Sequence, residues 1–306
     1  MAHIIKNLWD RFCKESIVGK YIYANVAVYV TVALVGVFAT LMNAVLPIAE
    51  FMRWFELPAS VVHLLYQPWS LVTYMFIHNG FMHIAWNMFA LYGFGRIFLN
   101  FYSTKHFIGV YFFGGIVGGL FFVFAYNLFP YFESVVEESY LVGASAAVMA
   151  IVVASAVRTP NTVVNLFFFG AVRLATLAAI TVFISMLLLS SENAGGNFAH
   201  IGGAVAGAIF AISLNKGHDV TKLINWAYDL SVRFATKVKQ LFTRRPKMEF
   251  KRTSNSSTKH SADYDYNARR REKENTMNEI LDKVKRSGYS SLTDEEKKRL
   301  FDSSQK

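Results

Sequence analysis

The middle of this chain consists of long apolar runs that carry almost no charge. Charged residues gather in the first 20 positions and after position 215, and 54% of the 306 residues are hydrophobic. Soluble domains rarely reach that share of apolar residues. A helix of about 20 apolar residues crosses a hydrocarbon core about 30 Å thick. The sequence therefore predicts an integral membrane protein.

Six apolar runs are long enough to be considered as membrane spans. The expected fold class is all-α: a polytopic bundle of six transmembrane helices, followed by a small helical tail. The fourth and sixth runs are shorter than the others. The predicted spans are residues 21–44, 71–99, 107–129, 141–157, 174–189 and 198–214.

The distribution of charge predicts the partners and the orientation. A formal charge of +10 suggests either nucleic acid or anionic lipid. Because the basic residues flank the apolar spans, we expect membrane lipids and no nucleic acid. Cytoplasmic loops carry an excess of Lys and Arg, so we place both termini in the cytoplasm. The outer segments then hold one basic residue, Arg53, together with Glu50, Glu56, Glu133, Glu137, Glu138 and Glu192.

The tail after the last span divides into three stretches. Residues 219–242 have apolar side chains at helical spacing and a basic polar face, which is typical of a helix lying on an anionic leaflet. A soluble helix packed on protein has the same pattern. Residues 244–266 form a polar, basic linker, and 267–286 form a helix that ends near Gly288. Thr293 and Glu296 fit a capping box that opens a last short helix.

These features give four predicted regions. They are a cytosolic N-terminal segment (1–20), the six-span core (21–214), a basic amphipathic helix with its linker (215–266) and a cytosolic helical hairpin (267–306).

Polar residues within membrane spans are functional candidates, because burying them in lipid is unfavourable. No Asp or Glu lies within the six predicted spans. This excludes an aspartyl protease dyad and the usual carboxylate of a proton-coupled transporter. The chain also lacks an H-E-x-x-H motif, so a zinc metalloprotease is not expected. We expect neither a metal nor a cofactor.

The remaining polar candidates lie at a similar depth. Ser145 is 13 residues from Arg158 and His83 is 13 residues from Arg96, which is about 20 Å of helix in each case. His200 is 16 residues from Lys216, or about 24 Å. Residues of three separate spans therefore converge in the outer half of the membrane.

The chemistry of these residues suggests a role for each. A serine hydroxyl needs a neighbouring base, so Ser145 is the candidate nucleophile and His200 its base, as a dyad without a carboxylate. Asn87 lies one turn below His83 on the same helix face. The side chains of Asn87 and His83 and the backbone N–H of Ser145 could together stabilise an oxyanion. A new helix beginning at Ser145 would expose that N–H.

Further residues, Met149 among them, are expected to support the site. Gly143 and Gly203 allow helices to approach closely, and His78 is expected to bond a loop carbonyl near the outer surface. A lone serine among Gly and Ala is more often a packing residue. The shared depth of the serine, the histidines and the asparagine is what favours the catalytic interpretation.

Residues 21–214 resemble the rhomboid intramembrane serine proteases. His83-Ile84-Ala85-Trp86-Asn87 is similar to the H-x-x-x-N motif of the second span, and Gly143-Ala144-Ser145 to the G-x-S motif of the fourth. Ala199-His200-Ile201-Gly202-Gly203 is similar to the A-H-x-x-G motif of the sixth. The resemblance implies a Ser145–His200 dyad with His83 and Asn87 as oxyanion donors. It also implies substrates that are transmembrane helices weakened by small residues near the outer face, and a place in a bacterial cytoplasmic membrane.

The sequence departs from the family pattern at three places. Ala146 replaces the glycine after the serine, and Met149 replaces a frequent tyrosine, where its thioether can pack on the ring of His200. The first-loop Trp-Arg pair reads Trp69-Ser70, so an arginine contact in that loop is expected to be missing.

Two alternatives are weighed against a protease. A catalytically silent, rhomboid-like adaptor would bind membrane helices without cutting them, but such relatives usually lose the serine or the histidine. A channel or small-solute transporter lacks support, because the chain has neither internal repeats nor intramembrane carboxylates.

Overall fold

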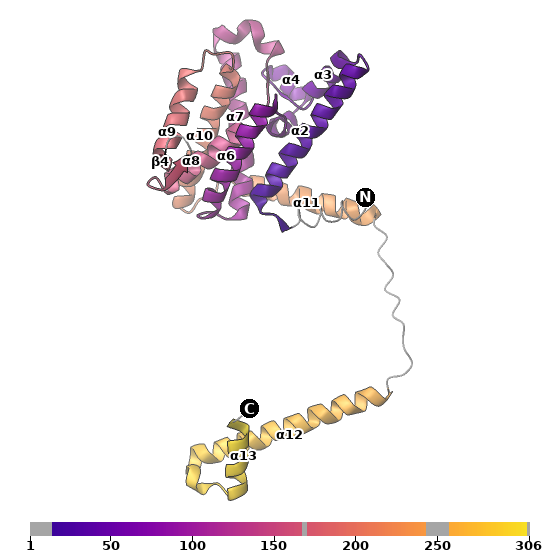
Figure 1. Ribbon diagram of the computed structural model, residues 1–306, viewed down its shortest axis with the longest axis vertical. Coiled ribbons are helices and arrows are strands. Elements are labelled where there is room, and N and C mark those ends of the chain that lie inside the picture. The colour runs from indigo at the N-terminus through magenta and orange to yellow at the C-terminus, as the bar shows by residue number, and fades with distance from the viewer. Residues whose placement is uncertain (1–13, 167–169, 243–256, 305–306) are drawn as a thin grey trace. The chain divides into compact units, whose positions relative to one another are not determined.

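The computed structural model describes residues 14–166, 170–242 and 257–304. The chain separates into two compact units, Met1–Lys239 and Gln240–Lys306. The larger unit is a helical bundle, and the smaller one contains the C-terminal helices (Figure 1).

Six helices build the bundle, and each overlaps one predicted span. Among the described residues, three of them are long and apolar enough to cross a membrane: α2, α7 and α10. The predicted polytopic helical class is confirmed, with α8 and α9 as shorter apolar helices. The bounds are α2 (Ile17–Leu41), α6 (Phe81–Leu99), α7 (Thr104–Leu128), α8 (Ser145–Arg158), α9 (Leu174–Leu187) and α10 (Ala194–Asn215).

Helix α7 lies at the centre and packs most extensively against α10 and α8. Small residues permit this close approach, as expected for helices that associate in lipid. A Cβ at Gly203 of α10 would overlap the carbonyl oxygen of Ala146 on α8, and one at Gly207 would overlap that of Ala150. Glycine at both positions therefore sets how closely the helix that carries His200 lies to the one that begins at Ser145.

The predicted start of the second span, residue 71, is wrong. Residues 71–99 do not form one helix, because α5 (Ser70–Thr73) and η1 (Tyr74–Phe76) come first and α6 begins at Phe81. Residues 77–80 are not helical, and Gly80 precedes α6 with a φ of +89°, a conformation that favours glycine. His78 consequently lies in the loop before α6 and not within a span.

Two connecting loops are joined next to the start of α8. β1 (Leu57–Pro58) pairs antiparallel with β2 (Tyr140–Leu141), with Leu57 opposite Leu141. The first of these loops also holds α3 (Val45–Arg53) and α4 (Val61–Tyr66), and the other holds η2 (Pro130–Glu138). The pairing fixes the backbone two residues before Gly143. The sequence analysis predicted no strands.

Arg53 of the first loop makes a contact that the sequence analysis did not predict. The guanidinium of Arg53 lies over the ring of Tyr140, 5.2 Å from its centroid. Trp69 stacks on Trp54, with ring centroids 6.0 Å apart, and its indole N–H donates to the Trp54 carbonyl oxygen. The loop is therefore held by Arg53 and by the tryptophan pair.

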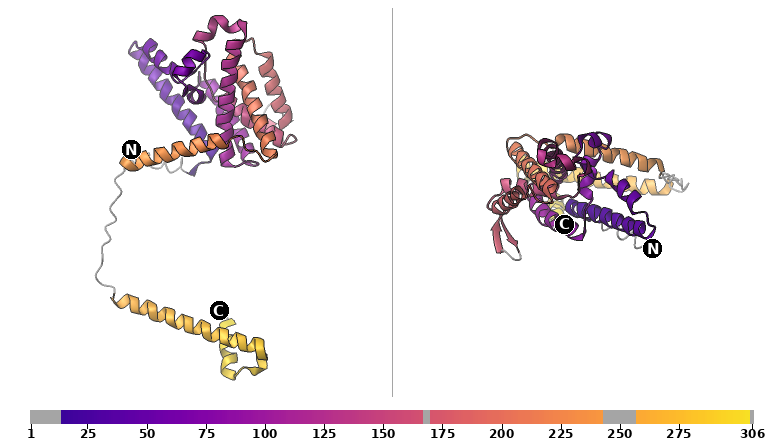
Figure 2. Two further views of the ribbon diagram at one scale, coloured as in Figure 1. Left: turned by 180° about the vertical axis from the view of Figure 1, so that it is seen from behind. Right: turned by 90° about the horizontal axis from the view of Figure 1, so that it is seen from above.

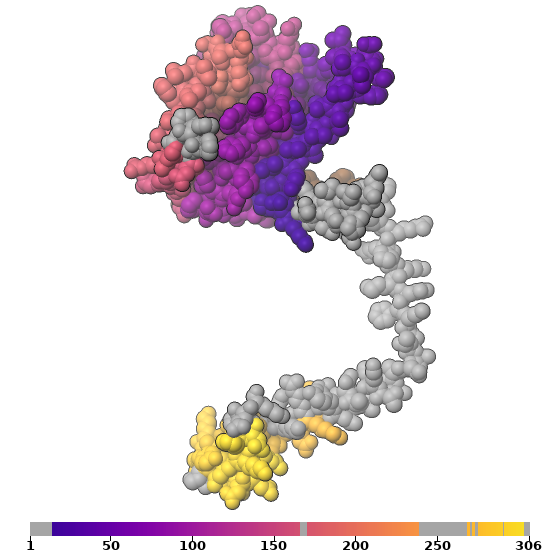
Figure 3. Space-filling model, in the orientation of Figure 1, coloured from indigo at the N-terminus to yellow at the C-terminus, as the bar shows by residue number. Residues whose placement is uncertain are grey.

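A second pair of strands and helix α11 lie at the other end of the bundle. β3 (Val163–Leu166) pairs antiparallel with β4 (Gly170–Arg173), and α11 (Lys222–Phe242) runs across that end (Figures 1 and 2). Figure 3 shows α6, in purple, on the face between α2 and the α9–α10 side of the bundle.

Helix α11 begins later than the predicted residue 219, because Asp219 caps the turn before it. The Asp219 carboxylate accepts the backbone N–H of Thr221 at 2.8 Å and lies 3.7 Å from the imidazole of His106. Further along, Leu230 and Phe234 remain exposed. These two apolar side chains are therefore not covered by protein within the described residues, whereas Tyr228 packs partly against the core of the bundle.

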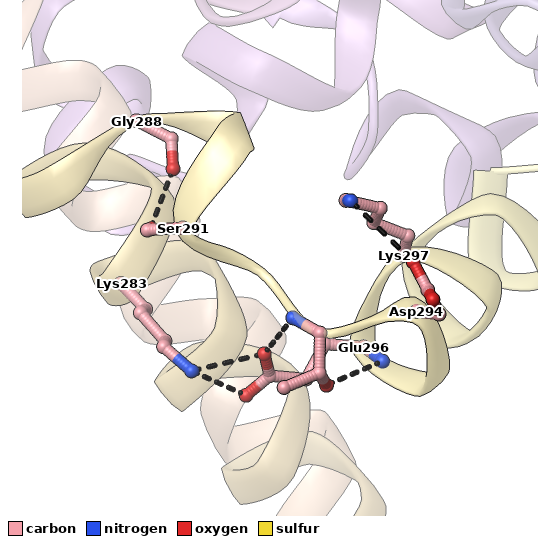
Figure 4. Close-up of polar contacts among 7 residues, drawn as sticks. Lys283, Gly288, Ser291, Asp294, Glu296 and Lys297 are labelled. Atoms are coloured by element: carbon pink, nitrogen blue, oxygen red, sulfur yellow. Dashed lines mark hydrogen bonds and ion pairs between the residues drawn. The ribbon is translucent and has the colours of Figure 1, made fainter.

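The smaller unit contains α12 (Ser257–Ser287), η3 (Tyr289–Ser291) and α13 (Asp294–Ser304). Gly288 ends the first of these helices with a φ of +78°. The predicted capping box is confirmed: the Thr293 N–H donates to the Glu296 carboxylate at 2.7 Å, and the Glu296 N–H donates to Thr293 Oγ1. Lys283 of α12 contacts both oxygens of Glu296 at 2.9 Å (Figure 4).

The predicted linker is too long at its C-terminal end. Residues 257–266 are helical and extend α12 toward the N-terminus, while residues 243–256 lie outside the described residues. No Gly or Pro occurs between residues 247 and 287, so nothing in the sequence interrupts the helix there.

Candidate active site

Helix α8 begins at Ser145, as predicted. The segment before it is held from two sides: the Gly143 N–H donates to the Tyr74 carbonyl oxygen at 3.0 Å, and the Ala144 N–H donates to Nε2 of His78 at 3.5 Å. The first N–H groups of a helix have no partner within it. The N–H of Ser145 therefore remains available at the point where its side chain begins.

His78 has a partner that the sequence analysis did not predict. Its Nε2 accepts the N–H of Ala144. The imidazole is buried, and its ring centroid lies 5.2 Å from that of His83. His78 thus positions the backbone that leads into Ser145.

Gly143 allows the histidine of α6 to reach this backbone. Its φ is +120°, where a side chain is strained. A Cβ at this position would lie 2.7 Å from Nε2 of His83 and 3.9 Å from Oγ of Ser145. The His83 ring and the Ser145 hydroxyl therefore flank the same point beside the glycine.

Ser145, His200, His83 and Asn87 line one cavity of about 450 Å³. Helices α6, α8, α9 and α10 all contribute to its walls. Most of the remaining lining is apolar and comes from Trp86, Ala90, Phe94, Val142, Val148, Met149, Val152 and Leu177, with Thr181, Asn193 and Gly196 completing it.

Asn87 is buried and makes one hydrogen bond through its side-chain nitrogen. Its Nδ2 donates to the carbonyl oxygen of His83 at 2.9 Å. An amide NH₂ group has two hydrogens. One N–H of Asn87 therefore remains for a group bound in the cavity.

His200 has a partner that the sequence analysis did not identify. Its Nδ1 lies 3.2 Å from Oγ of Ser185 on α9. The same depth argument could have found this serine, because Ser185 is 12 residues from Arg173, or about 18 Å of helix. Nothing in the residue type alone indicated it, since a serine in a membrane helix commonly bonds its own backbone.

Met149 lines the cavity together with His200, and its sulfur lies 3.8 Å from Oγ1 of Thr181. The thioether thus contacts α9. Gly203 lies outside the cavity lining and acts through the α8–α10 approach described above.

The cavity has few ionisable groups in its lining. None of its lining residues is Asp, Glu, Lys or Arg. Within the described ranges, no cluster of His, Cys, Asp and Glu is arranged to hold a metal ion.

In the first loop, burial raises the pKa of Glu56, and the nearby Arg53 opposes that shift.

A comparison with protein families decides the identity of the bundle. Residues 65–216 match the rhomboid domain. The chain carries a rhomboid domain. The family resemblance is thereby confirmed over these residues, and the chain is a multi-pass membrane protein. All four proposed catalytic and oxyanion residues of this chain fall inside the rhomboid range.

The tail matches a different family. Residues 260–306 match a family of unknown function, DUF6576, which covers most of α12 together with η3 and α13. No curated protein matches the chain.

Proposed function

We propose that this rhomboid protein is an intramembrane serine endopeptidase. One observation carries the proposal: Ser145 at the start of α8, His200 of α10, and His83 and Asn87 of α6 all line one cavity. Each of these residue types has a distinct use in cutting a peptide bond, and no carboxylate competes for the role of base in the cavity lining.

In the proposed reaction, Oγ of Ser145 attacks the carbonyl carbon of the scissile bond. His200 takes the hydroxyl proton as the new C–O bond forms, and later gives it to the leaving amine nitrogen as the C–N bond breaks. Water then attacks the acyl-enzyme, with His200 as the base again, and the serine is regenerated.

The negative oxygen of each tetrahedral intermediate needs donors that are already in place. The N–H of Ser145, the remaining N–H of Asn87 and the imidazole of His83 are the candidates. Positioning His83 against Gly143 and bonding Asn87 to the His83 carbonyl fixes both side chains before a substrate binds.

The proposed substrates are transmembrane helices with small, helix-weakening residues. The cavity is lined mainly by apolar side chains, which suits a segment arriving from lipid. A helix must unwind locally before its backbone reaches Ser145, because its peptide groups are otherwise shielded by their own hydrogen bonds.

The proposed orientation has both termini in the cytoplasm and the site open to the outside, with membrane lipid covering the exposed apolar side chains of α11. Reporter fusions after Lys216 and within residues 133–138 should then report opposite sides of the membrane. Signals from the same side would contradict this topology.

Labelling with a serine-reactive fluorophosphonate tests the proposed nucleophile. Wild-type protein should be labelled at Ser145, and Ser145→Ala should not. A silent membrane-helix adaptor would remain unlabelled in both forms, so an unlabelled but folded wild type would favour that alternative.

A further inference from the structure

Ser185 is the single hydrogen-bonding partner of the His200 ring within the described part of the chain. Its Oγ lies 3.2 Å from Nδ1. Ser185 is 4% exposed, although α9 is otherwise a peripheral helix with only Leu174 and Ala178 also buried. A buried hydroxyl on the inner side of this helix therefore meets the proposed base directly.

The second hydrogen bond of Ser185 determines the direction of the first. Its hydroxyl donates to the carbonyl oxygen of Thr181 at 3.0 Å. A hydroxyl has one hydrogen, so Oγ is left with lone pairs to offer to the imidazole. With the hydroxyl hydrogen directed at Thr181, the contact with His200 has Nδ1–H as the donor and Ser185 as the acceptor.

This direction has a chemical consequence. A neutral imidazole carries its proton on one nitrogen, and the bond made at one nitrogen decides which tautomer is present. With the proton on Nδ1, the lone pair is on Nε2. That is the nitrogen free to accept the proton of a nucleophile.

We propose that Ser185 is a positioning residue that holds His200 in the Nδ1–H tautomer and fixes the orientation of its ring. The use of that tautomer as a base rests on the proposed function above. Ser185 thereby takes the place that a carboxylate occupies in a three-residue site, as a neutral acceptor supplied by α9. When His200 takes a proton, the contact also stabilises the imidazolium, because Ser185 remains an acceptor.

A direct test is to determine the tautomer of the wild-type protein by ¹⁵N NMR with labelled histidine. The His200 signals are those that disappear in His200→Gln. We expect a protonated Nδ1 and an unprotonated Nε2, with a partial shift to the Nε2–H form in Ser185→Ala. A wild-type His200 protonated at Nε2 would overturn the proposal, whatever the activity of the protein.

Kinetics supply a second, independent test with a matched control. Ser155 on α8 is also buried and donates to the carbonyl four residues before it, but it makes no hydrogen bond to a histidine within the described residues. Ser185→Ala should lower kcat by on the order of 10–100-fold with KM nearly unchanged, similar to the loss of a group that orients a metal-ligating histidine. Ser155→Ala should keep the wild-type kcat.

Rescue separates positioning from packing. Ser185→Thr retains a hydroxyl that can bond the same carbonyl and should recover most of the lost kcat. If Ser185→Ala matched Ser155→Ala in kcat, or if a folded Ser185→Thr were as slow as Ser185→Ala, the positioning role would be refuted. Activity in Ser145→Ala would instead refute the protease function and leave the tautomer result unaffected.

Discussion

The imidazole of His83 lies against the backbone of Gly143, so that a β-carbon at residue 143 would be 2.7 Å from Nε2 of the ring. Two features disfavour any side chain at residue 143. The backbone has a φ of +120°, and the available space is already taken by His83. Glycine at this position thus couples the turn before Ser145 to a proposed oxyanion donor.

Gly143→Ala should therefore impair both stability and activity. We expect the free energy of unfolding to fall by about 1–3 kcal/mol from backbone strain. Displacement of His83 should lower cleavage by on the order of 10²-fold, as for the loss of one oxyanion donor. Thermal unfolding and cleavage of a model substrate measure the two effects.

Gly93→Ala is the control for this variant. Gly93 lies on the same helix as His83, and a Cβ there would meet open space. It should keep wild-type activity and stability or gain slightly in stability, since alanine favours a helix. Equal behaviour of the two variants would contradict the special role of Gly143.

Removal of the Asn87 amide should reduce activity without abolishing it. The loss of one oxyanion donor typically lowers the rate by about 10²–10³-fold, while the nucleophile and base remain. Asn87→Ala should thus retain weak, measurable cleavage in an assay where Ser145→Ala shows none. An Asn87→Ala rate equal to wild type would remove Asn87 from the oxyanion site.

Local chemistry made several features predictable from the sequence. The charge-free runs predicted the helices of the bundle, and Gly288 and the Thr293–Glu296 pair predicted the end of α12 and the start of α13. These signals lie within a few residues of the structure they determine. The placement of Ser145 at a helix start also followed from the shortness of its apolar run.

Features that depend on distant partners were not predicted. The β1–β2 pairing involves two residues on each side, with Leu57 and Leu141 far apart in sequence, so neither strand has a local pattern. The Ser185–His200 contact joins two helices and needs their rotation as well as their depth. The break at residues 77–80 was missed because apolar runs lie on both sides of it, although Asn79-Gly80 is a dipeptide that marks turns.

Acid should loosen the C-terminal hairpin through Glu296. The Thr293 N–H and the Lys283 ammonium hold the pKa of this carboxyl below its ordinary range. A carboxyl group whose pKa is lower in the folded than in the unfolded state stabilises the fold. The stabilisation is complete above the unfolded-state pKa, about 4.3 for Glu, and is lost as the pH falls through the folded-state pKa. Amide exchange over residues 288–300 of the full chain should reveal the change.

Two variants make this measurement specific. Glu296→Gln should exchange faster than wild type at neutral pH, and the difference should close as the pH falls through the lowered folded-state pKa of Glu296, where the wild-type carboxyl is protonated as well. Glu295→Gln, in the same first turn of α13, should behave as wild type. A difference between wild type and Glu296→Gln that persisted unchanged in acid would contradict the role given to the carboxylate.

The C-terminal unit should be dispensable for the chemistry. All residues that line the cavity lie between residues 83 and 200, and the hairpin is closed by its own cap and ion pair. A chain that ends after Arg245 keeps α11 and should cleave a detergent-solubilised model substrate at a near wild-type rate. Loss of turnover in this shortened but folded protein would instead indicate control of the site by the tail.

Cleavage of a purified single-span model substrate by wild type and by Ser145→Ala tests the proposed function most directly. The two proteins should have the same thermal stability, since the change removes one hydroxyl from a half-buried side chain. We predict that the wild type cuts the substrate within its transmembrane segment and that Ser145→Ala does not. Cleavage by Ser145→Ala at the wild-type rate would contradict the proposed nucleophile and the mechanism built on it.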